Sequence, residues 1–223
     1  VESPIIMRDG PSLLGDGDLA TDDNRNVLLI EIDQLRADCV AGALQDDVDL
    51  KNLRSFQQDA VRFDQHFSVI NPCGPSRCSL LTGKYGMNHR SVRNTTPLAS
   101  GIPNLATESR KAGYLPSLFG YTDTGQDPRG RHPKDPDLGQ EETRIEGIEE
   151  RVEMRLGQSY PWRAYLRAQG YDVPAYERFY DPIPENPGQS PKPTDPPFYR
   201  ADHSDTAFLA NSFMDHIATR DDQ

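Results

Sequence analysis

The chain has 223 residues, 35% of them hydrophobic, and a formal net charge of −11. This length suits one α/β domain, and the negative charge excludes nucleic acid and an anionic membrane surface as expected partners. The three cysteines form no even disulfide framework and no apolar run is long enough to span a membrane, so we expect a cytoplasmic protein in a reducing compartment.

The first elements lead up to an acidic residue. Residues 1–25 are rich in Gly, Asp and Ser without an apolar period, which predicts a loose lead-in segment before the folded part starts at Asn26. Residues 26–32 form a mostly apolar run that is typical of a central parallel strand covered on both faces. Asp33 follows, at the end of the strand where α/β proteins build their sites, and is a candidate metal ligand. The alternative is that Asp33 only caps the following turn.

The next two segments predict a helix and a strand in sequence. Apolar residues recur at helical spacing from Leu50 to Ala60, and Val61, Phe63 and Phe67 follow at even intervals. A helix followed by a strand is what a βαβ unit requires. We therefore expect the strand to lead directly into the next motif.

The run from Asn71 to Gly83 places Cys73, Pro75 and Arg77 at the start of a predicted short helix. Pro75 suits a first helical position and Gly83 suits the residue just past the end. The first N–H groups of a helix lack internal partners and its dipole favours negative charge, so the helix start attracts anions. Cys73 is expected to face a bound phosphate or sulfate group, with Arg77 as a fixed cation beside it.

This run resembles the signature of the sulfatase family, in which Cys-x-Pro-Ser-Arg precedes a Leu-Thr-Gly helix end. In that family the cysteine is oxidised to formylglycine, whose hydrate attacks sulfur or phosphorus. The resemblance implies that Cys73 is the precursor of the nucleophile, that a formylglycine-generating enzyme or its equivalent is a partner, and that Arg77 is catalytic. Two alternatives are a purely structural cysteine and a redox or metal-binding pair of Cys73 with Cys78, although a spacing of five would point these thiols to different helix faces.

Three later residues match substrate-binding positions of the family. Asn94 follows the cysteine at the interval of an active-site asparagine, which would donate a hydrogen bond to a nonbridging oxygen. Tyr121 and Asp123 stand where typical sulfatases carry a lysine and a histidine, and their surroundings resemble the phosphonate monoester hydrolase branch instead. Whether Thr122 or Asp123 faces the pocket stays open, and Tyr121 can also be an ordinary aromatic residue at a strand end.

The resemblance also implies a metal ion. Sulfatases end the first strand in two acidic ligands, whereas this chain has Asp33 and Gln34, as in the phosphonate monoester hydrolase branch. The implied cofactor is one divalent ion (Ca, Mn or Mg), with Asp33 and the group derived from Cys73 as ligands. Gln34, which we count with the substrate-binding residues, can offer a carbonyl oxygen to a hard cation but adds no negative charge.

The remaining elements follow in order. Helices are predicted over about 103–112, over 145–156 with Ile145, Ile148, Val152 and Leu156 as one face, and over 161–170. A strand precedes Tyr121, and Pro116 makes it irregular or places it near an edge. Prolines crowd residues 174–197, which predicts an extended arm or lid, with a solvated surface connection as the alternative. A last helix begins at Ser204 or Asp205.

The resemblance covers residues 26–218 and implies an α/β fold with a mostly parallel central sheet and flanking helices, like that of alkaline phosphatases and sulfatases. The family's later histidine strand, metal pair and lysine have no match here, so residues 26–223 are predicted to be the amino-terminal part of a truncated catalytic domain. The expected function is metal-dependent hydrolysis of a small-molecule sulfate, phosphonate or phosphodiester monoanion, with a homo-oligomer as the full-length parent. The alternative is an inactive or noncatalytic fragment of this fold that serves as an anion-binding or interaction module.

Overall fold

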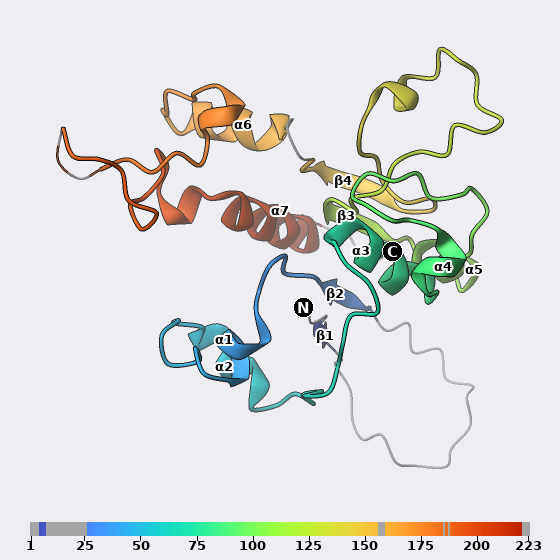
Figure 1. Ribbon diagram of the computed structural model, residues 1–223, viewed down its shortest axis with the longest axis horizontal. Coiled ribbons are helices and arrows are strands. Elements are labelled where there is room, and N and C mark those ends of the chain that lie inside the picture. Colours follow the sequence, from blue (N-terminus) through green and yellow to red (C-terminus); the bar gives the residue numbers. More distant parts are fainter. Residues whose placement is uncertain (1–4, 8–25, 156–158, 185, 187, 220–223) are drawn as a thin grey trace. The chain divides into compact units, whose positions relative to one another are not determined.

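The computed structural model describes residues 5–7, 26–155, 159–184, 186 and 188–219 (Figure 1). The chain divides into two compact units, unit 1 from Val1 to Val69 and unit 2 from Ile70 to Gln223, and each is described by itself. Most of the predicted lead-in over residues 1–25 lies outside the described residues. Among the described ranges, no helix combines the length and the apolar character needed to cross a membrane.

Unit 1 contains β1 (Ile5–Met7), β2 (Leu28–Ile30), α1 (Ala37–Ala41) and α2 (Lys51–Gln57). The prediction of a parallel, doubly covered strand over 26–32 was wrong in this unit: β2 pairs antiparallel with β1, and its side chains are half-buried. An apolar run is compatible with either strand direction, and the neighbouring strand decides between them. The helix expected from Leu50 is confirmed as α2.

The predicted strand over residues 61–67 was also wrong. These residues form no strand, and Val61, Phe63 and Phe67 are all exposed. Even spacing indicates a strand only where one face becomes buried, because a strand is stabilised by side chains packed on that face and by a paired neighbour.

Unit 2 is a mixture of helices and a parallel strand pair. Strands β3 (Ser117–Gly120) and β4 (Glu149–Glu153) run parallel, with a register shift between Leu118 and Phe119 that agrees with the irregular strand predicted after Pro116. The helices are α3 (Cys73–Thr82), α4 (Gly86–His89), α5 (Leu105–Lys111), α6 (Tyr160–Ala168) and α7 (Asp205–Thr219), with short 3₁₀ turns at Pro136–Gly139, Tyr176–Arg178 and Ala201–His203.

The helix predicted over 145–156 was wrong, because this segment contains β4; Leu156 lies outside the described residues. Its apolar residues serve two different clusters. Ile145 is buried with Cys78 and Leu98, whereas Val152 packs against the cluster around Trp162. Residues spaced like one helix face can therefore belong to two separate cores, and the backbone changes direction between them at Gly147, where φ is 91°.

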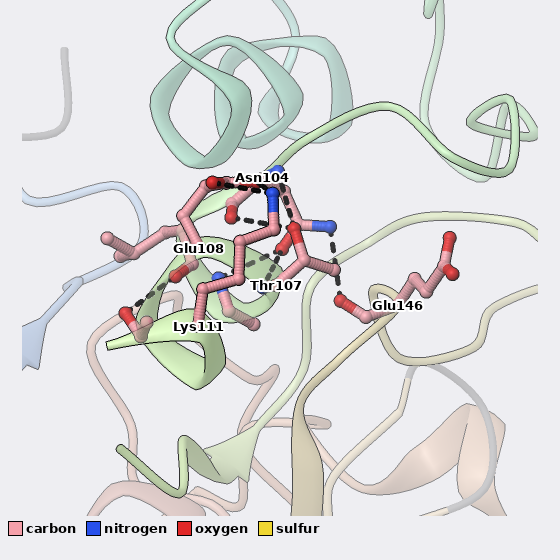
Figure 2. A network of polar contacts seen from close by, with 8 residues as sticks. Asn104, Thr107, Glu108, Lys111 and Glu146 are labelled. Carbon is pink, nitrogen blue, oxygen red and sulfur yellow. Dashed lines mark hydrogen bonds and ion pairs between the residues drawn. The ribbon is translucent and has the colours of Figure 1, made fainter. Parts of the chain in front are cut away.

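Helix α5 confirms the prediction over 103–112 and is fixed at its start by Asn104 (Figure 2). The Asn104 Oδ1 atom accepts hydrogen bonds from the N–H groups of Ala106 at 2.9 Å and Thr107 at 3.1 Å, and Thr107 Oγ1 accepts from the Asn104 N–H at 3.0 Å. This is a capping box. Asn104 Nδ2 also donates to the Glu146 carbonyl at 3.1 Å, which ties the helix start to the chain that enters β4.

The last part of unit 2 is organised around Trp162 on α6, which confirms the helix predicted over 161–170. Trp162 is fully buried, and the rings of Phe179 and Tyr199 from the segment after α6 contact it edge-on at 5.6 and 5.1 Å. Helix α7 starts as predicted, with the Ser204 hydroxyl accepting a hydrogen bond from the Ala207 N–H at 3.2 Å. In Figure 1, α7 lies beside β3, and Phe119 of β3 and Phe213 of α7 are in ring contact at 5.5 Å.

Candidate active site

Helix α3 carries the sequence motif and begins at Cys73, two residues before the start predicted from Pro75. The first helical hydrogen bond runs from the Ser76 N–H to the Pro72 carbonyl at 3.0 Å. Pro75 therefore occupies the third helical position, where its missing N–H breaks no internal bond. Gly83 ends the helix in the left-handed region, with φ of 65°, as predicted. Cys73 lies in the first turn as a half-buried free thiol.

The Asn94 side chain accepts a hydrogen bond at the start of α3, where the residue before the helix provides none. Pro72 offers no side-chain cap, and the Asn94 Oδ1 atom accepts from the Gly74 N–H at 3.0 Å. The approach is close: a Cβ atom at Gly74 would stand 2.8 Å from the Asp123 carbonyl oxygen and 3.0 Å from Asn94 Cα. Glycine is needed next to Cys73 because two distant segments meet its backbone.

Arg77 is buried one helical turn after Cys73. Its guanidinium lies over the Tyr121 ring at 4.3 Å, and Nη2 donates to the Tyr121 hydroxyl at 3.2 Å. Nη1 is 3.5 Å from Asp123 Oδ2, and the two side chains are only 4% and 1% exposed. Ring and carboxylate together hold the planar cation in one orientation, and the carboxylate offsets much of its charge.

The segment after β3 positions Asp123. Its backbone has φ of 54°, and its N–H donates to Oε1 of the buried Glu142 at 2.9 Å. The Thr122 hydroxyl instead donates to the Thr143 carbonyl at 3.1 Å. Both residues are buried, but the Asp123 carboxylate is the group that reaches Arg77. Sequence reasoning missed Glu142 and Thr143, because these partners come from a segment about 20 residues away with no local signal.

His89, at the end of α4, is another buried residue that sequence reasoning missed. Its Nε2 lies 2.9 Å from the Ser79 hydroxyl, and its Nδ1 accepts the Ser91 N–H at 3.0 Å. Burial lowers the pKa of His89 below its usual range, because a charged imidazolium would lose its hydration. The neutral imidazole is therefore the form that suits this buried position.

The two helix cysteines lie in different surroundings. Cys78 is fully buried beside Leu98 and Ile145, and burial raises the pKa of its thiol. Cys73 and Cys78 are both free. The helix thus separates the two thiols, and the structure contains no Cys73–Cys78 disulfide.

Of the expected metal residues, Asp33 and the neighbouring Gln34 belong to unit 1. Asp33 follows β2 and is half-buried, while Gln34 is exposed and has φ of 59°. A carboxylate and an amide oxygen are donors that suit a hard cation, which takes six or more oxygen ligands. Within the residues that the structure describes, no group of three or more His, Cys, Asp or Glu side chains is placed to hold a metal ion. Asp33 and Gln34 thus fit part of such a shell.

A cavity of about 610 Å³ adjoins Asn94. Arg93, Gln126 and residues 137–141 contribute to its mostly polar walls. The structure therefore gathers Cys73, Arg77, Asn94, Tyr121 and Asp123 around the first two turns of α3, and of these five residues Asn94 lines the cavity.

A helix start with a cysteine, a buried arginine and an adjoining asparagine presents donors that suit an anion, and comparison with known proteins identifies the class. The Sulfatase family model matches residues 25–221, so the chain belongs to the sulfatase family. This match confirms the resemblance to the sulfatase family and the predicted α/β fold.

Three relatives are informative. The chain is 33% identical over 211 residues to the multifunctional alkaline phosphatase superfamily protein PehA of Trinickia caryophylli, over 88% of this chain and 39% of that protein. The phosphonate monoester hydrolase SpPMH from Silicibacter pomeroyi has 56% identity and a TM-score of 0.78, over 83% of this chain and 36% of that one. The phosphonate monoester hydrolase of Agrobacterium radiobacter has 38% identity and a TM-score of 0.67, over 75% and 32%. The chain thus spans less than two fifths of the length of each of these relatives.

Proposed function

We propose that this chain is the amino-terminal part of a hydrolase that acts on singly charged phosphonate monoesters, phosphodiesters and sulfate monoesters. Membership of the sulfatase family and similarity to two phosphonate monoester hydrolases support the reaction class. The arrangement of Arg77, Tyr121 and Asp123 supports a substrate with a single negative charge.

The choice of a singly charged substrate rests on the buried pair of Arg77 and Asp123. Phosphonate monoesters, phosphodiesters and sulfate monoesters carry one negative charge at neutral pH, whereas a phosphate monoester carries nearly two. A carboxylate 3.5 Å from the guanidinium, with both groups out of water, reduces the positive field that a dianion requires. A singly charged ester therefore fits this end of the site better than a phosphate monoester does.

Each residue has a proposed role. Cys73, converted to formylglycine, supplies the nucleophile at the start of α3, where the helix dipole and Arg77 favour the bound anion. Asn94 Oδ1 is held by the Gly74 N–H, which leaves Nδ2 to donate to a nonbridging oxygen. The Tyr121 hydroxyl accepts a hydrogen bond from Arg77 Nη2 and helps to fix the guanidinium beside the bound anion. Asp33 and Gln34 would hold part of the shell of one divalent ion, which would supply Lewis-acid polarisation of the ester oxygen when bound.

Kinetics on four ester classes test this proposal. The full-length protein, coexpressed with a formylglycine-generating system, should hydrolyse aryl phosphonate monoesters and phosphodiesters best, sulfate monoesters more slowly, and phosphate monoesters least. Peptide mass spectrometry of the segment with Cys73 shows whether the aldehyde has formed. An unmodified thiol in every such preparation would refute the formylglycine mechanism for this protein.

A preference for sulfate or phosphate monoesters would overturn the charge argument. If the aldehyde forms and no ester is hydrolysed, the noncatalytic anion-binding module becomes the better description. Calorimetric titration with inorganic sulfate and phosphate would then measure that binding directly.

A further inference from the structure

His89 joins three segments of unit 2. It ends α4, its side chain is 2% exposed, and it contacts Ser79 on α3 and Ser91 on the following loop. Because Nδ1 accepts the Ser91 N–H, the ring proton lies on Nε2 and is donated to the Ser79 hydroxyl. One neutral tautomer therefore satisfies both neighbours.

The loop that His89 holds is the loop that carries Asn94. Ser91 precedes Asn94 by three residues, and Asn94 Oδ1 bonds back to the Gly74 N–H at 3.0 Å. Arg90, which lies between His89 and Ser91, has φ of 61°, so the chain reverses sharply after α4. The contacts form a closed ring: α3 at Ser79, then His89, then the loop, then α3 again at Gly74.

We infer that His89 is a positioning residue that fixes Asn94 against the first turn of α3. Neither of its hydrogen-bonding nitrogens faces Cys73, and it acts through the loop instead. With the Ser91 N–H anchored at one end and Gly74 at the other, the short segment between them can hold the Asn94 amide in one orientation. This inference rests on the proposed function only in assigning Asn94 to the bound ester.

His132 provides a matched control within the same chain. Its Nδ1 also accepts a backbone N–H two residues on, from Lys134 at 3.2 Å, but the side chain is exposed. His132→Gln therefore removes the same type of local bond without touching α3. His89→Asn and His89→Gln separate the two bonds of His89, because an asparagine Oδ1 takes the place of Nδ1 and a glutamine Nε2 takes the place of the ring Nε2.

Hydrogen exchange tests the positioning without any substrate. In the full-length protein, His89→Gln should speed exchange of the Ser91 and Gly74 amides about tenfold relative to the wild type, since each loses about one hydrogen bond of protection. His89→Asn should retain more of that protection, and His132→Gln should leave both amides unchanged. Unchanged exchange at Gly74 in His89→Gln, or equal acceleration of every amide, would overturn the inference. If His89→Gln does not fold, Ser79→Ala is measured in the same way and should loosen the same two amides.

A double-mutant cycle tests whether His89 acts through Asn94. His89→Gln should lower kcat/KM for an aryl phosphonate monoester about tenfold in the wild type and much less in an Asn94→Ala background. Additive losses would contradict the inference. If the wild type itself hydrolyses no ester, the proposed function fails, and the exchange measurement still decides the role of His89.

Discussion

Two buried clusters of unit 2 differ in the kind of side chain that fills them, polar in one and aromatic or aliphatic in the other. Around α3, buried polar side chains such as Arg77, His89 and Asp123 outnumber the apolar ones. Around α6, the buried residues are Met154, Trp162, Leu166 and Phe179. Arg77, His89 and Asp123 are oriented by specific hydrogen bonds or an ion pair, whereas the aromatic cluster packs by shape.

This difference separates stability from function. A buried ion pair gains little net stability, since desolvation cancels much of the attraction, whereas a buried aromatic cluster stabilises the fold through area and ring contacts. We therefore expect substitutions near α3 to change reactivity first and those near α6 to change folding first.

The largest effect is expected at Cys73. Cys73→Ala should lower kcat about a thousandfold or more in the full-length protein, because it removes the precursor of the nucleophile. Cys78→Ala, five residues along the same helix, should keep most of the turnover and lose about 1–3 kcal/mol of stability, because it shrinks a packed core. Steady-state kinetics with chemical denaturation of both variants is the check. Equal losses of turnover would favour the thiol-pair interpretation.

In the aromatic cluster the expected effect is on folding. Trp162→Ala should reduce the free energy of unfolding by about 3–5 kcal/mol, because it opens a cavity and removes an indole N–H that donates to the His203 carbonyl at 2.9 Å. Tyr160→Ala, on the same helix but exposed, is the control and should cost under about 1 kcal/mol. Denaturant melts measure both. Similar losses in the two variants would mean that this cluster does not dominate stability.

Removing the charge of Asp123 from its pair with Arg77 should change the preference between phosphate and phosphonate monoesters. Asp123→Asn removes the compensating charge, so the ratio of kcat/KM for a phosphate monoester to that for a phosphonate monoester should rise about tenfold. Asp202→Asn, in an exposed pair with Arg200, should leave this ratio unchanged. Parallel assays with matched aryl leaving groups give the ratio. A fall in the Asp123→Asn ratio would show that the carboxylate does not select against dianions.

The same contrast explains what the sequence could predict. Helix α3 with its Gly83 end, the helix over about 103–112 and the α6 pattern depend on neighbouring residues, so local rules found them. Asp123 was a candidate for the pocket beside Thr122, but its contact with Arg77 spans 46 residues and follows from the fold alone. Glu142 and the partners of His89 carried no local signal. The apolar spacing from Ile145 to Val152 predicted a helix because periodicity cannot tell one core from two.

A smaller effect is expected at the tyrosine that covers Arg77. Tyr121→Phe keeps the ring beneath the guanidinium but removes the hydroxyl that accepts from Nη2, and should reduce kcat/KM by about threefold to tenfold. Tyr114→Phe, at an exposed site, should change it less than twofold. The comparison requires only kinetics on one phosphonate monoester. Equal effects would mean that the Tyr121 hydroxyl does not contribute to the site.

The smallest effect concerns acid stability and again contrasts the two regions. Asp127 accepts hydrogen bonds from the Arg129 side chain at 2.8 Å and from the Ser100 N–H at 2.9 Å, and these lower the pKa of its carboxyl group. The folded-state pKa is below the unfolded value of about 3.9, so this stabilisation is present above that pH and is lost as the pH falls through the folded-state pKa. Melting temperatures of Asp127→Asn should therefore fall less steeply than those of the wild type below about pH 4 and run parallel from pH 5 to 8. Asp181 lies next to the aromatic cluster in an exposed pair with Arg178, and the melting temperatures of Asp181→Asn should change with pH as those of the wild type do. If the melting temperatures of Asp127→Asn also matched the wild type at every pH, Asp127 would not contribute to the acid response.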